Sequence, residues 1–126
     1  MLEPILPATF DLYYGGAWHK PLAGTRDATF DPATGTALAE VATAGAADVD
    51  AAVSAARAGF REWRDVVPLE RARILKEIAT IIRQHGDELA LLDAANCGNP
   101  YTEMRNDAGV AAAQMEFFAG LVTEMK

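Results

Sequence analysis

The stretch TFDPATGTALAEVATAGAADVDAAVSAARAGF, from Thr29 to Phe60, decides the fold. Its first part holds a tight turn at residues 31–35 between two runs that suit β-strands. Pro32 presets a negative φ for the turn, and Gly35 supplies a positive φ at little steric cost. We therefore expect a strand pair formed by Thr29–Phe30 and Ala37–Val41.

After this turn the spacing of apolar residues changes from that of a strand to that of a helix. Asp48 and Asp50 favour the positive end of the helix dipole, although Ala46 and Ala47 make a weak N-cap. One apolar stripe then runs along the expected helix, and we expect Phe60 and Trp63 within it to be core residues. The stripe comprises Val49, Ala52, Val53, Ala56, Phe60 and Trp63.

The residues before this stretch predict a second, shorter hairpin. Phe10–Tyr14 is aromatic and β-prone, Gly15-Gly16 is a turn signal, and Ala17–His19 can return. Residues 20–27 are expected to form a loop. The β portion thus falls within residues 10–41.

The residues after it predict three more helices, so that about four occupy residues 47–125. Pro68 suits the first turn of a helix, and Gly86 is expected to stop it. Asp87 can cap the next helix, which Gly98 ends. A last helix begins near Tyr101, and its apolar positions reach Met125. The chain reaches its end without a helix-stop signal, which indicates a break within a domain.

The fold class is therefore α+β and mostly helical, with residues 1–126 forming a partial domain. Of the 126 residues 51% are hydrophobic, but 26 are alanine, which contributes little buried area. The net charge of −7 argues against nucleic acid and anionic membrane surfaces as partners. No basic signal segment precedes an apolar run, so a cytoplasmic protein is expected.

No residue forms a convincing catalytic centre. Cys97 is the only thiol, and it falls at an expected helix C-terminus, where the dipole disfavours a thiolate. The chain has neither a G-x-G-x-x-G motif nor a P-loop. His19 and His85 lie far from acidic clusters, so a zinc site is not expected. We expect no catalytic and no cofactor-binding residues here.

The order of these elements resembles the N-terminal segment of the aldehyde dehydrogenase family. TFDPATGTALAEV resembles the NPATG-like turn of the family, and DVDAAVSAARAGFREW resembles the helix after it. FFAGLVTEMK is similar to the betaine-aldehyde-dehydrogenase-like branch. Asp31 replaces the usual Asn. The resemblance implies the first part of an NAD(P)-binding α/β domain, with the nucleotide crevice, general base and nucleophile elsewhere.

The resemblance also implies a monovalent cation site. In the family, backbone oxygens before the turn bind the ion together with an acid ahead of a YYAG-like motif. Thr29 and Phe30 precede the turn here, and Asp107 lies ten residues before Phe117, which opens FFAG. Oxygen ligands suit such hard cations. The alternative is that Asp107 caps or starts the last helix.

Two functions remain open. The first is the N-terminal part of an enzyme that oxidises an aldehyde to a carboxylic acid with NAD or NADP. Its partner is then the rest of the enzyme chain or another copy in a homo-oligomer. The second is a non-catalytic helical interaction module derived from such an enzyme. The sequence identifies neither the aldehyde nor the preferred nucleotide.

Overall fold

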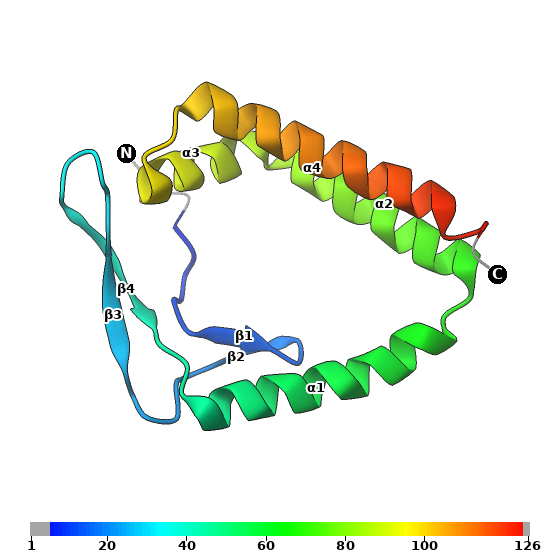
Figure 1. Ribbon diagram of the computed structural model, residues 1–126, viewed down its shortest axis with the longest axis horizontal. Coiled ribbons are helices and arrows are strands. Elements are labelled where there is room, and N and C mark those ends of the chain that lie inside the picture. The colour runs from blue at the N-terminus through cyan, green and yellow to red at the C-terminus, as the bar shows by residue number, and fades with distance from the viewer. Residues whose placement is uncertain (1–5, 125–126) are drawn as a thin grey trace. The chain divides into compact units, whose positions relative to one another are not determined.

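The computed structural model describes residues 6–124, which divide into two compact units. Residues 6–65 form the first unit, and the described part of the second is residues 66–124. The first holds four strands and one helix, and the second holds three helices (Figure 1). Two antiparallel strand pairs and four helices are the elements that the sequence predicts.

The first strand pair is the predicted short hairpin. Strand β1 (Leu12–Tyr14) pairs antiparallel with β2 (Ala17–His19). Gly15 and Gly16 have φ values of 59° and 81°, a left-handed conformation that glycine adopts without strain. The ring of Tyr13 meets that of Trp18 edge to face across the pair. This local chemistry explains why so short a hairpin can be predicted.

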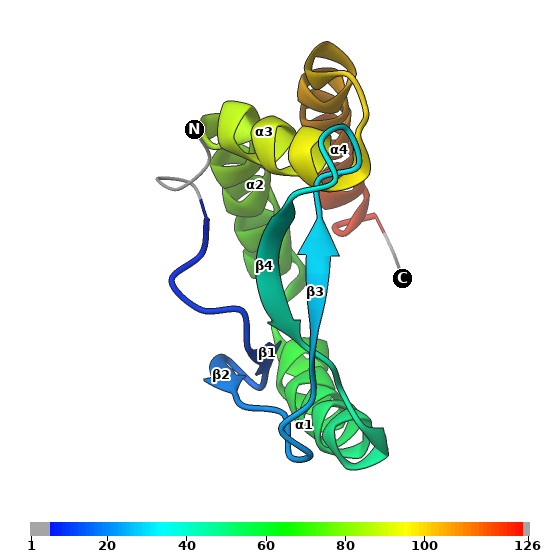
Figure 2. The ribbon, with the colours of Figure 1, turned by 90° about the vertical axis from the view of Figure 1, so that its left-hand side faces the viewer.

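The second strand pair, β3 (Arg26–Phe30) and β4 (Ala37–Ala42), contains the deciding turn (Figure 2). The Gly35 amide donates to the Asp31 carbonyl at 2.7 Å, and Gly35 has a φ of 70°. The register shifts between Thr29 and Phe30, which marks a β-bulge. β3 begins two residues earlier than the predicted loop allows, because Arg26 still pairs with Ala42.

Helix α1 (Ala46–Asp65) begins with a cap that the sequence analysis did not identify. Asp48 is buried, and its carboxylate accepts hydrogen bonds from the Gly45 amide at 2.9 Å and the Leu22 amide at 3.1 Å. The bond to Gly45 is half of a capping box, in which the third helical residue reaches back to the N-cap. Asp48 therefore ties the loop after β2 to the helix start.

The second unit consists of α2 (Pro68–Gln84), α3 (Gly86–Cys97) and α4 (Tyr101–Leu121). Pro68 occupies the first turn, and Gly98 ends α3 with a left-handed φ of 75°, as predicted. Gly86 follows the C-cap His85 and so occupies the predicted C′ position after α2, and it also opens α3. Asp87 consequently lies inside the first turn of α3 rather than at its cap.

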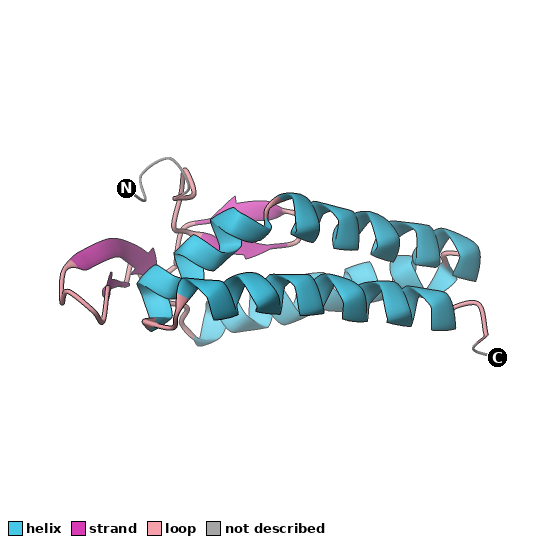
Figure 3. Ribbon diagram, turned by 90° about the horizontal axis from the view of Figure 1, so that it is seen from above, coloured by secondary structure: helices cyan, strands magenta, loops and turns pink. Residues whose placement is uncertain are grey.

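The core of this unit is a seam of small side chains between α2 and α4, which lie side by side (Figure 3). Seven residues, or two helical turns, separate its two positions on each helix, so both face the neighbouring helix. Alanine at these positions lets the backbones approach closely. The seam comprises Ala72 and Ala79 of α2 with Ala112 and Ala119 of α4.

Large apolar side chains, in contrast, remain exposed in both units. Phe60 is 61% exposed and Trp63 is 37% exposed on α1, so the expectation that they are core residues is wrong within the described chain. On α4, Phe117 and Phe118 are 64% and 58% exposed. Met125 lies outside the described residues. The described chain thus buries alanine and leaves many of its large apolar side chains exposed.

Candidate functional site

The three residues of the implied cation site lie in different units. Thr29 and Phe30 flank the bulge of β3 in the first unit. Asp107 is exposed and belongs to α4 of the second unit. It follows the helix start at Tyr101 by six residues, so the alternative that it caps or starts the helix is wrong. The ligand interpretation remains a prediction.

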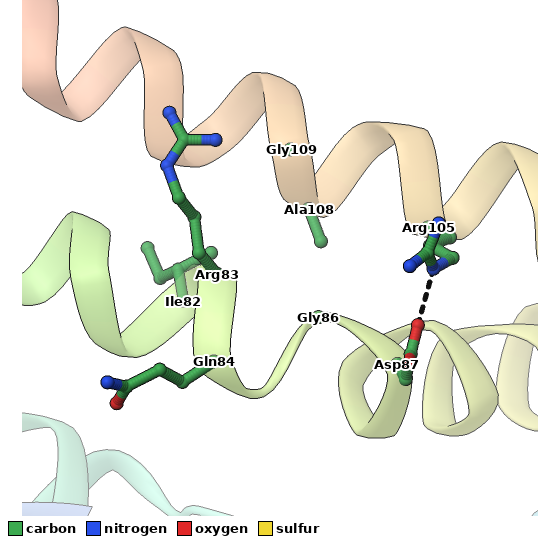
Figure 4. Close-up of a pocket in the computed structure, with 8 residues that line it drawn as sticks. All are labelled: Ile82, Arg83, Gln84, Gly86, Asp87, Arg105, Ala108 and Gly109. Atoms are coloured by element: carbon green, nitrogen blue, oxygen red, sulfur yellow. Dashed lines mark hydrogen bonds and ion pairs between the residues drawn. The ribbon is translucent and has the colours of Figure 1, made fainter.

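A hollow of about 310 Å³ lies in the helical unit, where α2 passes into α3 beside α4 (Figure 4). At one end Arg105 of α4 forms an ion pair with Asp87 of α3. The Tyr101 hydroxyl donates to the same carboxylate at 3.1 Å. Its lining comprises Ile82, Arg83, Gln84, Gly86, Asp87, Arg105, Ala108 and Gly109.

Charge pairing at this hollow lowers the pKa of two carboxyl groups. The hydrogen bond from Arg105, followed by that from Tyr101, lowers the pKa of the Asp87 carboxyl below its usual value. At the other end the Arg83 guanidinium lies 2.8 Å from Glu116 of α4 and likewise lowers the pKa of that carboxyl. Both arginines along the hollow are therefore neutralised by acids of this chain.

This pairing decides what the hollow can do. A site for an anionic ligand needs cationic groups with hydrogen-bond donors still available. Here each guanidinium already binds a carboxylate on a neighbouring helix, so the two pairs fasten α4 to α2 and α3. The sequence offers no signal for the Asp87–Arg105 pair, because 18 residues separate its members.

The first unit has a different kind of surface, formed by the open side of α1 beside β1. A hollow of about 410 Å³ has Tyr13, Val49 and Val53 in its lining. A second, of about 450 Å³, is lined by Val53, Ala56, Arg57, Phe60 and Arg61. The two share Val53 and Ala56 and so follow the helix continuously. Their walls are mostly hydrocarbon, which suits packing against another segment rather than chemistry.

Groups that could perform catalysis are sparse in the described residues. Cys97 is exposed at the C-terminal end of α3. Within residues 6–124, no three His, Cys, Asp or Glu side chains cluster as metal ligands. Across that same range, no helix is both long and apolar enough to cross a membrane.

Comparison with known proteins gives one consistent result. The sequence profile of the "Aldehyde dehydrogenase family" matches residues 18–126. The chain is 38% identical, over 125 residues, to aldehyde dehydrogenase tropH of Talaromyces stipitatus. The aligned region covers 99% of this chain and 24% of that protein.

Solved structures agree in fold. The chain is similar to an aldehyde dehydrogenase from Bacillus cereus, with a TM-score of 0.92 and 31% identity over 99% of this chain and 26% of that one. It is also similar to PnpE, solved in complex with nicotinamide adenine dinucleotide, with a TM-score of 0.88 and 33% identity over 92% of this chain and 24% of that one. The chain thus spans about a quarter of the length of these relatives.

Proposed function

This chain belongs to the aldehyde dehydrogenase family, as an N-terminal segment of it, and we propose that it serves as the scaffold part of a complete NAD(P)-dependent enzyme. The complete enzyme oxidises an aldehyde to a carboxylic acid. The observation that carries the proposal is the match in fold to the Bacillus cereus enzyme across 99% of this chain. The exposed apolar side chains support it, because they need further polypeptide to cover them.

The described residues do not fit a nucleotide, so we assign NAD(P) binding to other parts of the complete enzyme. A dinucleotide pyrophosphate is held by a glycine-rich turn between a strand and the N-terminus of a helix. The glycines with positive φ lie instead in hairpins, in a loop and at a helix end. They are Gly15, Gly16, Gly24, Gly35 and Gly98.

We also propose that a monovalent cation binds at Thr29, Phe30 and Asp107 in the complete enzyme. The bulge between Thr29 and Phe30 supports this, because a bulge redirects backbone groups that a regular ladder would use. Asp107 supports it as an exposed carboxylate for which no ion pair is seen among the described residues. A set of backbone and carboxylate oxygens fits a hard cation.

The cation proposal makes a direct prediction. In the complete enzyme Asp107→Ala reduces the rise in melting temperature that potassium or sodium produces, because it removes the charged ligand. Glu103→Ala, an exposed acid on the same helix, is the matched control. Melting is followed by calorimetry with choline as the reference cation. An equal response of both variants and the parent contradicts the site.

We further propose that the complete enzyme is a cytoplasmic homo-oligomer. The single cysteine in the sequence supports a reducing compartment. The partners of this segment are then the rest of its own chain and other copies of the enzyme.

A chimera tests the proposed function. The 126 residues replace the matching quarter of the Bacillus cereus relative, and NAD(P)-dependent oxidation of simple aldehydes is measured. We expect turnover by the chimera and none by the 126 residues alone. A folded chimera without turnover, or turnover by the isolated chain, contradicts the proposal. A folded but inactive chimera favours the interaction-module alternative.

A further inference from the structure

One buried nitrogen of a charged side chain on α2 lacks a hydrogen-bond partner. The Nε atom of Arg71 is shielded from solvent, and no acceptor meets it within residues 6–124. The residue as a whole is half-buried. Across the same range no ion pair involves Arg71. A buried donor without an acceptor costs free energy, and the cost is larger when the group is charged.

The neighbouring Arg73 explains why α2 offers no acid to Arg71. Arg73 is exposed, yet it forms ion pairs with both acids of the helix, Glu70 at 2.6 Å and Glu77. Water already solvates an exposed guanidinium, so such pairs contribute little stability. Arg71 is further from solvent and has the greater need for an acceptor, but no carboxylate of its own helix is left to supply one.

Arg71 also stands at the start of an apolar line on α2. At intervals of four, three and four residues it is followed by Leu75, Ile78 and Ile82, so these positions share one side of the helix. Ile78 is 37% exposed, so this side is open among the described residues. Beside hydrocarbon the local dielectric is low, which makes an unpaired charge more costly and a paired one stronger.

We propose that Arg71 binds a carboxylate of the polypeptide that follows α4 in the complete enzyme. The proposal rests on the proposed function and adds to it one anchoring residue and the chemistry of its partner. Because the unpartnered atom is Nε, the carboxylate approaches the guanidinium side-on, with one oxygen on Nε and the other on the adjacent Nη. Lysine offers no such pair of parallel donors, so the position requires arginine.

The path of the chain favours the following polypeptide over a second copy as the source of the acid. α4 runs back along α2, so it ends beside the first turns of α2, where Arg71 is located (Figure 1). This segment covers only 26% of the Bacillus cereus relative, so in a complete enzyme further polypeptide continues from this point. That polypeptide starts next to Arg71 and reaches it without crossing to another molecule.

A crystal structure of the Bacillus cereus chimera tests the contact directly. We expect a carboxylate oxygen of an Asp or Glu from the relative's part within about 3.2 Å of the Arg71 Nε atom. A backbone carbonyl, an acid of residues 6–124, an acid of a second copy, or water alone at Nε overturns the proposal. Turnover is measured separately: an inactive chimera that contains the pair contradicts the proposed function alone, and an active chimera without the pair contradicts this inference alone.

Stability gives an independent measurement. Arg71→Lys keeps the charge but removes the side-on donors, and it shortens the half-life of the folded chimera at a fixed raised temperature at least about fivefold. Arg73→Lys is the matched control and changes the half-life less than about twofold, because its ion pairs are exposed. Unfolding is followed by circular dichroism, so the readout does not depend on turnover. Equal half-lives of the two variants overturn the proposal.

A double-mutant cycle separates a specific pair from a general loss of packing. The acid found at Nε is replaced by its amide, alone and together with Arg71→Lys. We expect the second substitution to shorten the half-life little further once the first is present, whereas additive effects overturn the pair. Should the chimera fail to fold, the two parts are co-expressed and their complex is measured by the same criteria. Parts that do not associate also overturn the proposal.

Discussion

Helix α1 and the pair α2 and α4 all carry alanine on one face, yet these faces end in opposite states. In the helical unit, Ala79 and Ala112 are completely buried where two helices meet. On α1 the stripe with larger side chains stays open, with Phe60 61% exposed. Burial therefore follows the presence of a partner rather than the hydrophobicity of the stripe. A small side chain that packs against a second helix is buried in the core, whereas a large one that meets no other element stays exposed at the surface.

The largest effect is expected from a substitution in the buried alanine seam between α2 and α4. Ala79→Leu forces three extra carbons between α2 and α4 and lowers the free energy of unfolding of that unit by about 1–3 kcal/mol. Amide hydrogen exchange then accelerates in α2 and α4 and stays unchanged in α1. Ala58→Leu, at an exposed position of α1, is the control and leaves exchange as it was. Equal effects of the two substitutions would refute the contrast between the helices.

Asp48 provides the next largest effect, this time within the first unit. Asp48→Ala removes the acceptor for the Gly45 and Leu22 amides and costs roughly 1–2 kcal/mol of local stability. Hydrogen exchange at the start of α1 reports the loss. The neighbouring acid Asp50 is exposed, so Asp50→Ala is expected to cost no more than about 0.5 kcal/mol. Indistinguishable exchange in the two variants would show that the cap is not formed.

Removal of a large apolar side chain from the α1 stripe should affect self-association more than stability. Phe60→Ser leaves helix stability within about 0.5 kcal/mol, because the side chain is mostly exposed, but it reduces self-association of the isolated chain. Analytical ultracentrifugation across a concentration series measures the change. A monodisperse parent chain would contradict the expectation that its apolar faces pair with other copies.

The smallest effect concerns the ion pair between α2 and α4. Because the pKa of Glu116 is lowered by Arg83, the pair contributes stability above the ordinary carboxylate pKa and loses it as the pH falls through the lowered value. The contribution is small because both groups are exposed. Glu116→Gln should reduce the fall in the free energy of unfolding at acid pH, measured by urea unfolding across a pH series. Glu124→Gln, another exposed acid near the chain end, should not.

Local chemistry explains which parts could be predicted. The turn of residues 31–35 and the stop at Gly98 depend on φ preferences that a few adjacent residues determine. Helical spacing likewise shows where each apolar stripe runs. The family resemblance, which the sequence profile confirms, depends on the order of such local motifs. None of these features requires knowledge of a distant residue.

The clearest error concerns a contact between residues that lie far apart in the sequence. Asp87 is expected to cap a helix but binds Arg105 on α4. The proposed cation residues remain untested, since they depend on how distant parts of the complete enzyme come together.

The sequence by itself determined the hairpins, the helices, their apolar stripes and the family, because each depends on residues that are close together in the sequence. Only the tertiary structure decided which stripe is core. The alanines of α2 and α4 are buried because a second helix lies within reach of their short side chains. Phe60 carries far more apolar area, yet it stays 61% exposed among the described residues. Burial is a property of two surfaces in contact, and a sequence pattern describes only one of them.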